Sequence, residues 1–167
     1  MLAGGGSALA VLGSGALARP SGGSLTEAGG GAALLLIDTA LPGWRAAAEV
    51  AGRAGVPFAQ FAGDLGSVWL ERLEPVWRHA PSAIAGVTFG GALFCAEQLA
   101  RGRGLVRSLC LPVSPGSSLR EWTELAIAQA ARPAGSLELA GAVRDDRPVA
   151  WALVPHAGPA KRSGASS

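Results

Sequence analysis

The stretch AGVTFGGALFCAEQLARGRGLVRSLCLPV, residues 85–113, decides the fold, because it carries a strand, a helix and a second strand in direct succession. Its first residues are apolar and end at Thr88, which a glycine-containing turn follows. Apolar positions at helical spacing then run to Gly102 and Gly104, where a helix is expected to end. LVRSLCLPV, residues 105–113, has the apolar character of a buried strand. This succession predicts a βαβ unit with a right-handed crossover.

The same alternation of strand and helix extends to both sides of this unit. Continuous apolar runs, which are typical of strands buried on both faces of a parallel sheet, alternate with segments of helical character. We expect strands at residues 32–38, 56–64, 81–88, 105–113 and 148–155, and helices at residues 42–55, 65–81, 90–104 and 118–131. Pro75 interrupts or restarts the second of these helices, because proline lacks the N–H group that a helix interior needs.

Strands that alternate with helices of about 10 to 15 residues predict an α/β fold. We expect a three-layer sandwich with a mostly parallel sheet of about five strands. The late strands, around residues 137–155, could pair antiparallel at an edge of that sheet. A chain of 167 residues suits a single domain, which we place at residues 32–156. Residues 157–167 are expected to form a solvated, disordered tail.

The first 31 residues differ in composition from the rest. MLAGGGSALAVLGSGALA, residues 1–18, contains no charged side chain, and a Gly/Ser-rich spacer follows it. Its glycines dilute the apolar run, so it falls short of the roughly 18 to 20 strongly apolar residues that a membrane span needs. It ends in Ala-Leu-Ala, residues 16–18, which matches a small-x-small cleavage site. We expect residues 1–31 to be a signal-like apolar leader, cleaved after Ala18, and a Gly/Ser-rich spacer; the alternative is a disordered leader without a targeting role.

Composition argues against several classes of function. The formal net charge is +2 and the arginines are scattered along the chain, so the sequence predicts no nucleic-acid partner. Two cysteines and two histidines, none of them at metal-ligand spacing, predict no metal site. The motifs of phosphate-binding loops, zinc proteases and serine hydrolases do not occur in the sequence, and we expect no cofactor.

Polar residues stand at the carboxyl ends of the first three predicted strands. They are Asp38, Asp64 and the turn that begins at Thr88. In open α/β sheets ligands bind at these ends, where the strand order reverses. With a strand order of 2-1-3-4, Asp38 and the Thr88 turn flank that point. Free backbone N–H groups, a capping threonine and the glycines Gly90 and Gly91 would hold an anion or the polar edge of a ligand there.

Each candidate residue also has a purely structural interpretation. A glycine pair after a strand often serves only to turn the chain, and an Asp at a strand end is more often a capping or turn residue. Glu97 is an ordinary helix-surface residue unless it points back over the rim and joins Asp38. Cys95 and Cys110 lie on a helix and the following strand, so they form a disulfide or two buried free thiols. A nucleophilic Cys95 near the helix N-terminus, with His79 as its base, is a further alternative.

Three large apolar side chains recur every fourth residue in the second predicted helix. They are Trp69, Leu73 and Trp77. This spacing is typical of a stripe that packs on the core. Because Pro75 interrupts the helix, the alternative is that Trp77 covers a pocket.

A block in the middle of the chain carries a resemblance. Between Gly63 and Ala100 it has the pattern GD, W, LxPxWR, P, IAGxT and LFCxExLA. This pattern, with the terminal VAWALVP, resembles a group of small exported bacterial proteins of the twin-arginine signal type. The leader is similar to the part of such a signal that follows the paired arginines, although no Arg or Lys precedes Arg19. The resemblance implies a periplasmic location and supplies no activity; a cytoplasmic location is the alternative.

The sequence therefore predicts an exported binding or accessory protein. It would hold a small polar ligand or a periplasmic partner protein at the rim of the sheet. One alternative is a hydrolase or transferase that uses Asp38 or Asp64 as a base together with the N–H groups of Thr88–Gly91. Another is a subunit of a periplasmic redox complex. Whether the protein is an enzyme, and its oligomeric state, are left open at this point.

Overall fold

The computed structural model describes residues 31–132, 139–140 and 144–156, apart from the side chains of His79, Leu139 and Ala140. The predicted leader and the predicted tail, residues 157–167, lie outside these ranges except for Gly31. The elements in chain order are β1 (Leu34–Asp38), α1 (Trp44–Ala54), β2 (Phe58–Phe61), α2 (Gly66–Val68), the π-helical turn η1 (Trp69–Leu73), α3 (Glu74–His79), β3 (Ile84–Phe89), α4 (Gly90–Arg101), β4 (Leu105–Pro112), α5 (Leu119–Ala130), β5 (Leu139–Ala140) and β6 (Pro148–Pro155).

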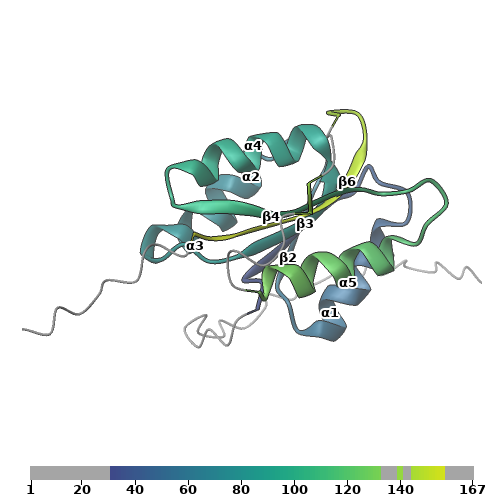
Figure 1. The fold of residues 1–167 in the computed structure, drawn as a ribbon, viewed down its shortest axis with the longest axis horizontal. Coiled ribbons are helices and arrows are strands. Elements are labelled where there is room, and N and C mark those ends of the chain that lie inside the picture. Colours follow the sequence, from purple (N-terminus) through teal and green to yellow (C-terminus); the bar gives the residue numbers. More distant parts are fainter. Residues whose placement is uncertain (1–30, 133–138, 141–143, 157–167) are drawn as a thin grey trace, which may run out of the picture.

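A mixed sheet runs through the molecule (Figure 1). Its strand order is β2-β1-β3-β6-β4-β5. β1 pairs in parallel with β2 and β3, and β4 pairs in parallel with the two-residue β5. β6 is antiparallel to both of its neighbours, β3 and β4. The predicted α/β class is confirmed, whereas the prediction of a mostly parallel sheet is wrong, because antiparallel pairing occupies the centre of the sheet.

β6 lies in the middle of the sheet because it is apolar along its whole length. All residues from Val149 to Val154 are buried. A strand without a polar face needs cover on both sides, which an edge position or a solvated face does not supply. The connection from β3 through α4 to β4 passes over one strand position, and β6 fills it. The antiparallel pairing expected at an edge is therefore central.

Helices cover both faces of the sheet (Figure 1). α4 packs on one face, together with η1 and α3, and α1 and α5 pack on the other. β1 shows the alternation that this requires: Leu34 and Leu36 belong to the first core, and Leu35 and Ile37 to the second. The alternation follows from the two-residue period of a strand. Asp38, the next residue in the series 34, 36, 38, therefore falls on the α4 face.

Two helix boundaries follow signals that are visible in the sequence. At the start of α5, Ser118 Oγ accepts a hydrogen bond from the N–H of Arg120 at 3.2 Å, as expected of a capping serine. At the end of α1, Gly55 adopts a left-handed conformation with φ 67°. This conformation favours glycine, and it ends the helix where the sequence predicts.

The predicted helix at residues 65–81 forms as three consecutive segments, α2, η1 and α3, with Pro75 at the start of the last. η1 is a π-helical turn, in which backbone hydrogen bonds span five residues instead of four. Pro75 follows it in the first turn of α3, where no N–H group is needed. Leu73 and Trp77 are buried in the core, which confirms the core interpretation for both. Trp69, the first residue of η1, is only half-buried and packs against the same core.

Candidate functional site

A cleft of about 710 Å³ opens at the carboxyl ends of β1, β2 and β3. Its volume lies within the range of about 300–1,000 Å³ that is usual for small-molecule sites. β2 and β3 lie on opposite sides of β1, so the cleft sits where the strand order reverses. This is the position that the sequence predicts for a site. The lining is provided by the strand ends, the segment after β2, one face of α4 and the segment before β6.

Asp38 lies deepest among the polar lining residues. Its side chain is 1% exposed, and Oδ1 accepts a hydrogen bond from the N–H of Ala40 at 2.9 Å. Among the described residues, no donor reaches Oδ2. Asp38 is the last residue of β1, so the turn after the strand engages one carboxylate oxygen, and the residue also lines the cleft.

Two further carboxylates line the mouth of the cleft. Asp64 is exposed, and its Oδ1 accepts a hydrogen bond from the N–H of Gly66 at 2.8 Å. This turn follows Gly63, whose φ of 72° suits glycine. Asp145 is exposed in the segment before β6, and its backbone carbonyl accepts from the N–H of Gly91 at 3.3 Å. Asp38 and Asp64 thus line one cleft, as predicted, and Asp145 joins them from a distant part of the sequence.

Thr88 faces the core and does not line the cleft. Its hydroxyl accepts a hydrogen bond from Trp151 Nε1 at 2.9 Å and donates to the carbonyl oxygen of Phe89 at 2.9 Å. The residue that precedes α4 is Phe89, which makes no side-chain cap. The expectation that Thr88 caps this helix is therefore wrong. Its position is explained by β3, in which Gly86 and Thr88 share the face that packs against Trp151.

The backbone N–H groups of the turn are already engaged. Gly90 donates to the carbonyl oxygen of Arg147 at 3.0 Å, and Gly91 donates to that of Asp145. Gly91 lines the cleft, whereas Gly90 is buried. The segment before β6 thus occupies the donors that the sequence predicts to be free for an anion. The partner carbonyls come from more than fifty residues along the chain, so local sequence gives no sign of them.

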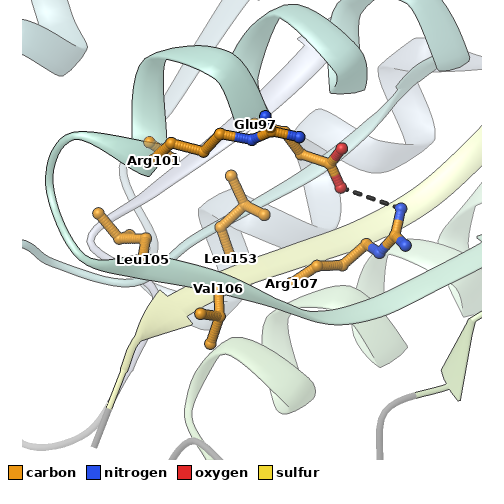
Figure 2. A pocket seen from close by; sticks show the side chains of 7 residues that line it. Glu97, Arg101, Leu105, Val106, Arg107 and Leu153 are labelled. Carbon is orange, nitrogen blue, oxygen red and sulfur yellow. Dashed lines mark ion pairs between the residues drawn. The ribbon is translucent and has the colours of Figure 1, made fainter. Parts of the chain in front are cut away.

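Glu97 does not line the cleft; it lies beside a second, smaller cavity, which Figure 2 shows. Its Oε1 forms an ion pair with Arg107 Nη1 of β4 at 3.0 Å. Both residues line a smaller cavity of about 280 Å³, together with Arg101 and Leu153. The helical face of α4 that reaches the cleft carries other residues, so Glu97 does not join Asp38.

Both cysteines are free in the structure. Cys95 is exposed on α4 and lines the cleft, whereas Cys110 is fully buried in β4. No bridge joins Cys95 to Cys110, and only one of the two thiols is buried, so neither the disulfide nor the pair of buried thiols is found. Burial raises the pKa of the Cys110 thiol; the Arg107 guanidinium opposes this effect and the Glu97 carboxylate adds to it.

The sequence interpretation missed the apolar wall of the cleft. Phe94 is 58% exposed, although it is a large apolar side chain, and Trp69 packs edge-on against Trp77 with ring centroids 5.7 Å apart. The other apolar lining residues are Leu65, Phe89, Ala92 and Leu99. Part of this wall could have been predicted from the sequence. Residues 91, 94, 95 and 98 have the spacing of one helix face, and that face starts at the turn after β3. Nothing in the local sequence marks Asp145.

The described residues contain no arrangement for a metal ion. In residues 31–132, 139–140 and 144–156, no group of three or more His, Cys, Asp or Glu side chains is placed to hold one. Among the lining residues that the structure describes, none is Lys, Arg or His. No helix in this part of the chain combines the length and apolar character needed to cross a membrane.

No family model matches the chain, and the comparisons with curated proteins and with solved structures find no match either. The resemblance in the central block therefore stays a prediction. The structure gives its residues physical roles nonetheless. Trp77, Gly86 and Thr88 belong to the core, whereas Asp64 and Trp69 line the cleft.

Proposed function

We propose that this protein binds a small ligand with an apolar body in the cleft at the carboxyl ends of β1, β2 and β3. The observation that carries the proposal is that a cleft of small-molecule size has an exposed apolar wall. Phe94 and Leu70 are the most exposed large apolar side chains of the described residues, and Phe94 lies on this wall. A concave apolar surface with a few convergent polar groups is the usual form of a ligand site.

The backbone of the Thr88–Gly91 turn supports binding rather than turnover. The hydrolase or transferase alternative needs N–H groups there to stabilise negative charge as it develops. Gly90 and Gly91 both donate to carbonyl oxygens instead, and no Lys, Arg or His of the described lining replaces them. That alternative retains Asp38 and Asp64 as bases, but the N–H groups of Gly90 and Gly91 that it assigned to the oxyanion are engaged elsewhere. No specific feature of the described residues supports the redox-subunit alternative.

A neutral fluorescent probe tests the binding function. N-phenyl-1-naphthylamine is apolar and emits strongly in apolar sites, so the full chain should bind it in the cleft with a stoichiometry of one. Phe94→Ser should weaken its binding about threefold to tenfold, because the substitution removes an exposed aromatic contact worth about 1 kcal/mol. The bound probe should also slow alkylation of Cys95, which lines the same cleft.

Leu125→Ser is the matched control for this experiment. Leu125 is 38% exposed on α5, on the opposite face of the sheet. Probe affinity should not change in this variant. Equal affinities for wild-type protein and Phe94→Ser, or an equal loss in both variants, would contradict binding in the cleft.

We also propose that the protein is exported, on the apolar residues 1–18 and their small-x-small ending. The proposal rests on the sequence and on the resemblance described above. The mass of the protein recovered from the extracytoplasmic fraction of its own host tests it. A chain that begins at Arg19 is the expected result. A chain that retains residues 1–18 and is found only in the cytoplasm would overturn the proposal.

A further inference from the structure

Asp38 is a buried carboxylate with one oxygen left over. Its side chain is 1% exposed, Oδ1 accepts from the N–H of Ala40, and among the described residues nothing donates to Oδ2. A carboxylate that is withdrawn from water loses hydration, and it is stabilised again only by hydrogen bonds or by an opposite charge. Because Asp38 lines the cleft, a ligand in the cleft can reach this oxygen.

The charged side chains that line the cleft are all carboxylates. Asp64 and Asp145 add two exposed carboxylates at its mouth. Arg144 and Arg147 lie near Asp145 in the sequence, but neither lines the cleft, and Arg144 is paired with Asp146 at 3.7 Å. The described lining includes carboxylates but no Lys, Arg or His. Such a cleft has a negative potential, which attracts cations and repels carboxylates and phosphates.

The aromatic wall favours the same ligand chemistry. The faces of Phe and Trp rings carry partial negative charge and attract ammonium groups. Trp69 and Phe94 stand on the wall of the cleft that also includes Asp38. A bare metal ion is a poor alternative, because no group of three His, Cys, Asp or Glu side chains in the described ranges is arranged to bind one.

We infer that the ligand is an organic amine: a protonated primary amine on an aromatic or aliphatic body. This inference rests on the binding function proposed above and names the class of molecule bound. The ammonium donates a hydrogen bond to Oδ2 of Asp38, and the body of the ligand packs against Phe94 and Trp69. Asp64 and Asp145 raise the local concentration of cations at the mouth.

Three probes with the same aromatic body separate the charge of the ligand from its apolar part. They are 2-phenylethylamine, 2-phenylethanol and phenylacetate, each measured by displacement of N-phenyl-1-naphthylamine from the full chain. We expect the amine to bind at least tenfold more tightly than the alcohol, and phenylacetate to bind most weakly. If the alcohol matches the amine, or if none of the three displaces the naphthylamine probe, the amine assignment is wrong while the proposed function stands. If the naphthylamine probe itself does not bind, both are wrong.

A carboxylate-to-amide substitution locates the ammonium. Asp38→Asn keeps an oxygen that can accept from Ala40 and removes the charge, so it should abolish the preference for the amine over the alcohol and leave binding of the neutral probe unchanged. Asp145→Asn, at an exposed position, should reduce the preference only about twofold to threefold. Glu124→Gln on α5 is the control, because Glu124 is exposed and does not line the cleft. A preference that survives in Asp38→Asn overturns the assignment of Asp38; if that variant does not fold, the three-probe series on the wild-type chain decides.

Discussion

Trp151 of β6 lies directly over Gly86 of β3. The two residues face each other in the antiparallel register, and a Cβ atom added at Gly86 would lie 2.3 Å from Cε2 of the indole ring. The indole N–H donates to Thr88 Oγ1, two residues further along β3. β3 therefore has no side chain where the ring lies and a hydroxyl group where the N–H points, which fixes how β3 and β6 align.

Gly86→Ala should destabilise the protein strongly. The added methyl group overlaps the ring of Trp151, which is fully buried and has no room to move in a close-packed core. Overpacking of this kind costs about 1–3 kcal/mol and occasionally more. Urea denaturation followed by tryptophan fluorescence measures the loss as a lower midpoint with an unchanged slope.

Gly52→Ala is the matched control for this substitution. Gly52 lies in the exposed face of α1, and an added Cβ would have no neighbour within 4 Å. Alanine is a better helix former than glycine by about 0.5–1 kcal/mol, so this variant should be more stable than the wild type. If the two glycine variants shifted the midpoint equally, the clash with Trp151 would not be the cause.

Thr88→Val should cost about 1–3 kcal/mol, because it leaves the indole N–H of Trp151 buried without an acceptor. Valine has nearly the shape of threonine, so the loss reports the hydrogen bond rather than a cavity. Thr88→Ser keeps the hydroxyl and should retain the bond, with a smaller loss from the missing methyl group. The free energies of unfolding of the two variants decide the matter: a serine variant no more stable than the valine variant would contradict this account.

The positions of the strands could be predicted from the sequence because each is a short apolar run between turn residues. The predicted runs at residues 32–38, 105–113 and 148–155 all contain the observed strands β1, β4 and β6. The place of β6 in the sheet was predicted wrongly. A signal for it was present, since a run as uniformly apolar as VAWALV needs cover on both faces and hence a central position. Its direction depends on the long connection from α5, which has no local signature.

The candidate site could be predicted only in part, for a similar reason. Asp38 ends β1 and Asp64 follows β2, and because these two strands are parallel, their direction is enough to bring both residues to one edge. Whether the Thr88 hydroxyl and the N–H of Gly90 are free depends on Trp151 and on the carbonyl of Arg147, both distant in sequence. Whether a polar group is free at a turn is thus settled by tertiary contacts, which periodicity and turn signals do not describe.

The Glu97–Arg107 pair should contribute modestly to stability. The side chains are 23% and 31% exposed, and Arg107 Nε is buried without a partner among the described residues. Glu97→Gln should therefore cost about 1 kcal/mol, since it removes the opposite charge from a half-buried guanidinium. A double-mutant cycle with Arg107→Met should give a coupling energy of about 0.5–1 kcal/mol.

The more exposed Glu74–Arg78 pair provides the comparison for that cycle. Its Arg78 side chain is 65% exposed, and the two residues are one helical turn apart. A cycle with Glu74→Gln and Arg78→Met should give a coupling energy of about 0.3–0.5 kcal/mol. A larger coupling for Glu74–Arg78 than for Glu97–Arg107 would contradict the role assigned to burial.

Stability should fall as the pH rises above 9. Burial raises the pKa of the Cys110 thiol above its ordinary value of 9.0. Below that value the thiol is protonated in both the folded and the unfolded chain, so it adds no pH dependence. Above it the unfolded thiol ionises first and releases its proton. The free energy of unfolding then decreases, with a slope that approaches about 1.4 kcal/mol per pH unit, until the raised pKa of the folded state is reached.

The composition of the chain makes this slope measurable. The sequence contains no tyrosine and one lysine, so few other side chains titrate between pH 9 and 11. Cys110→Ala should remove the slope, whereas Cys95→Ser should keep it, because Cys95 is exposed. Urea denaturation at intervals between pH 8 and 10.5 measures all three proteins. A free energy of unfolding that is constant for the wild type over this range, or that falls equally in Cys110→Ala, would show that the buried thiol does not control alkaline stability.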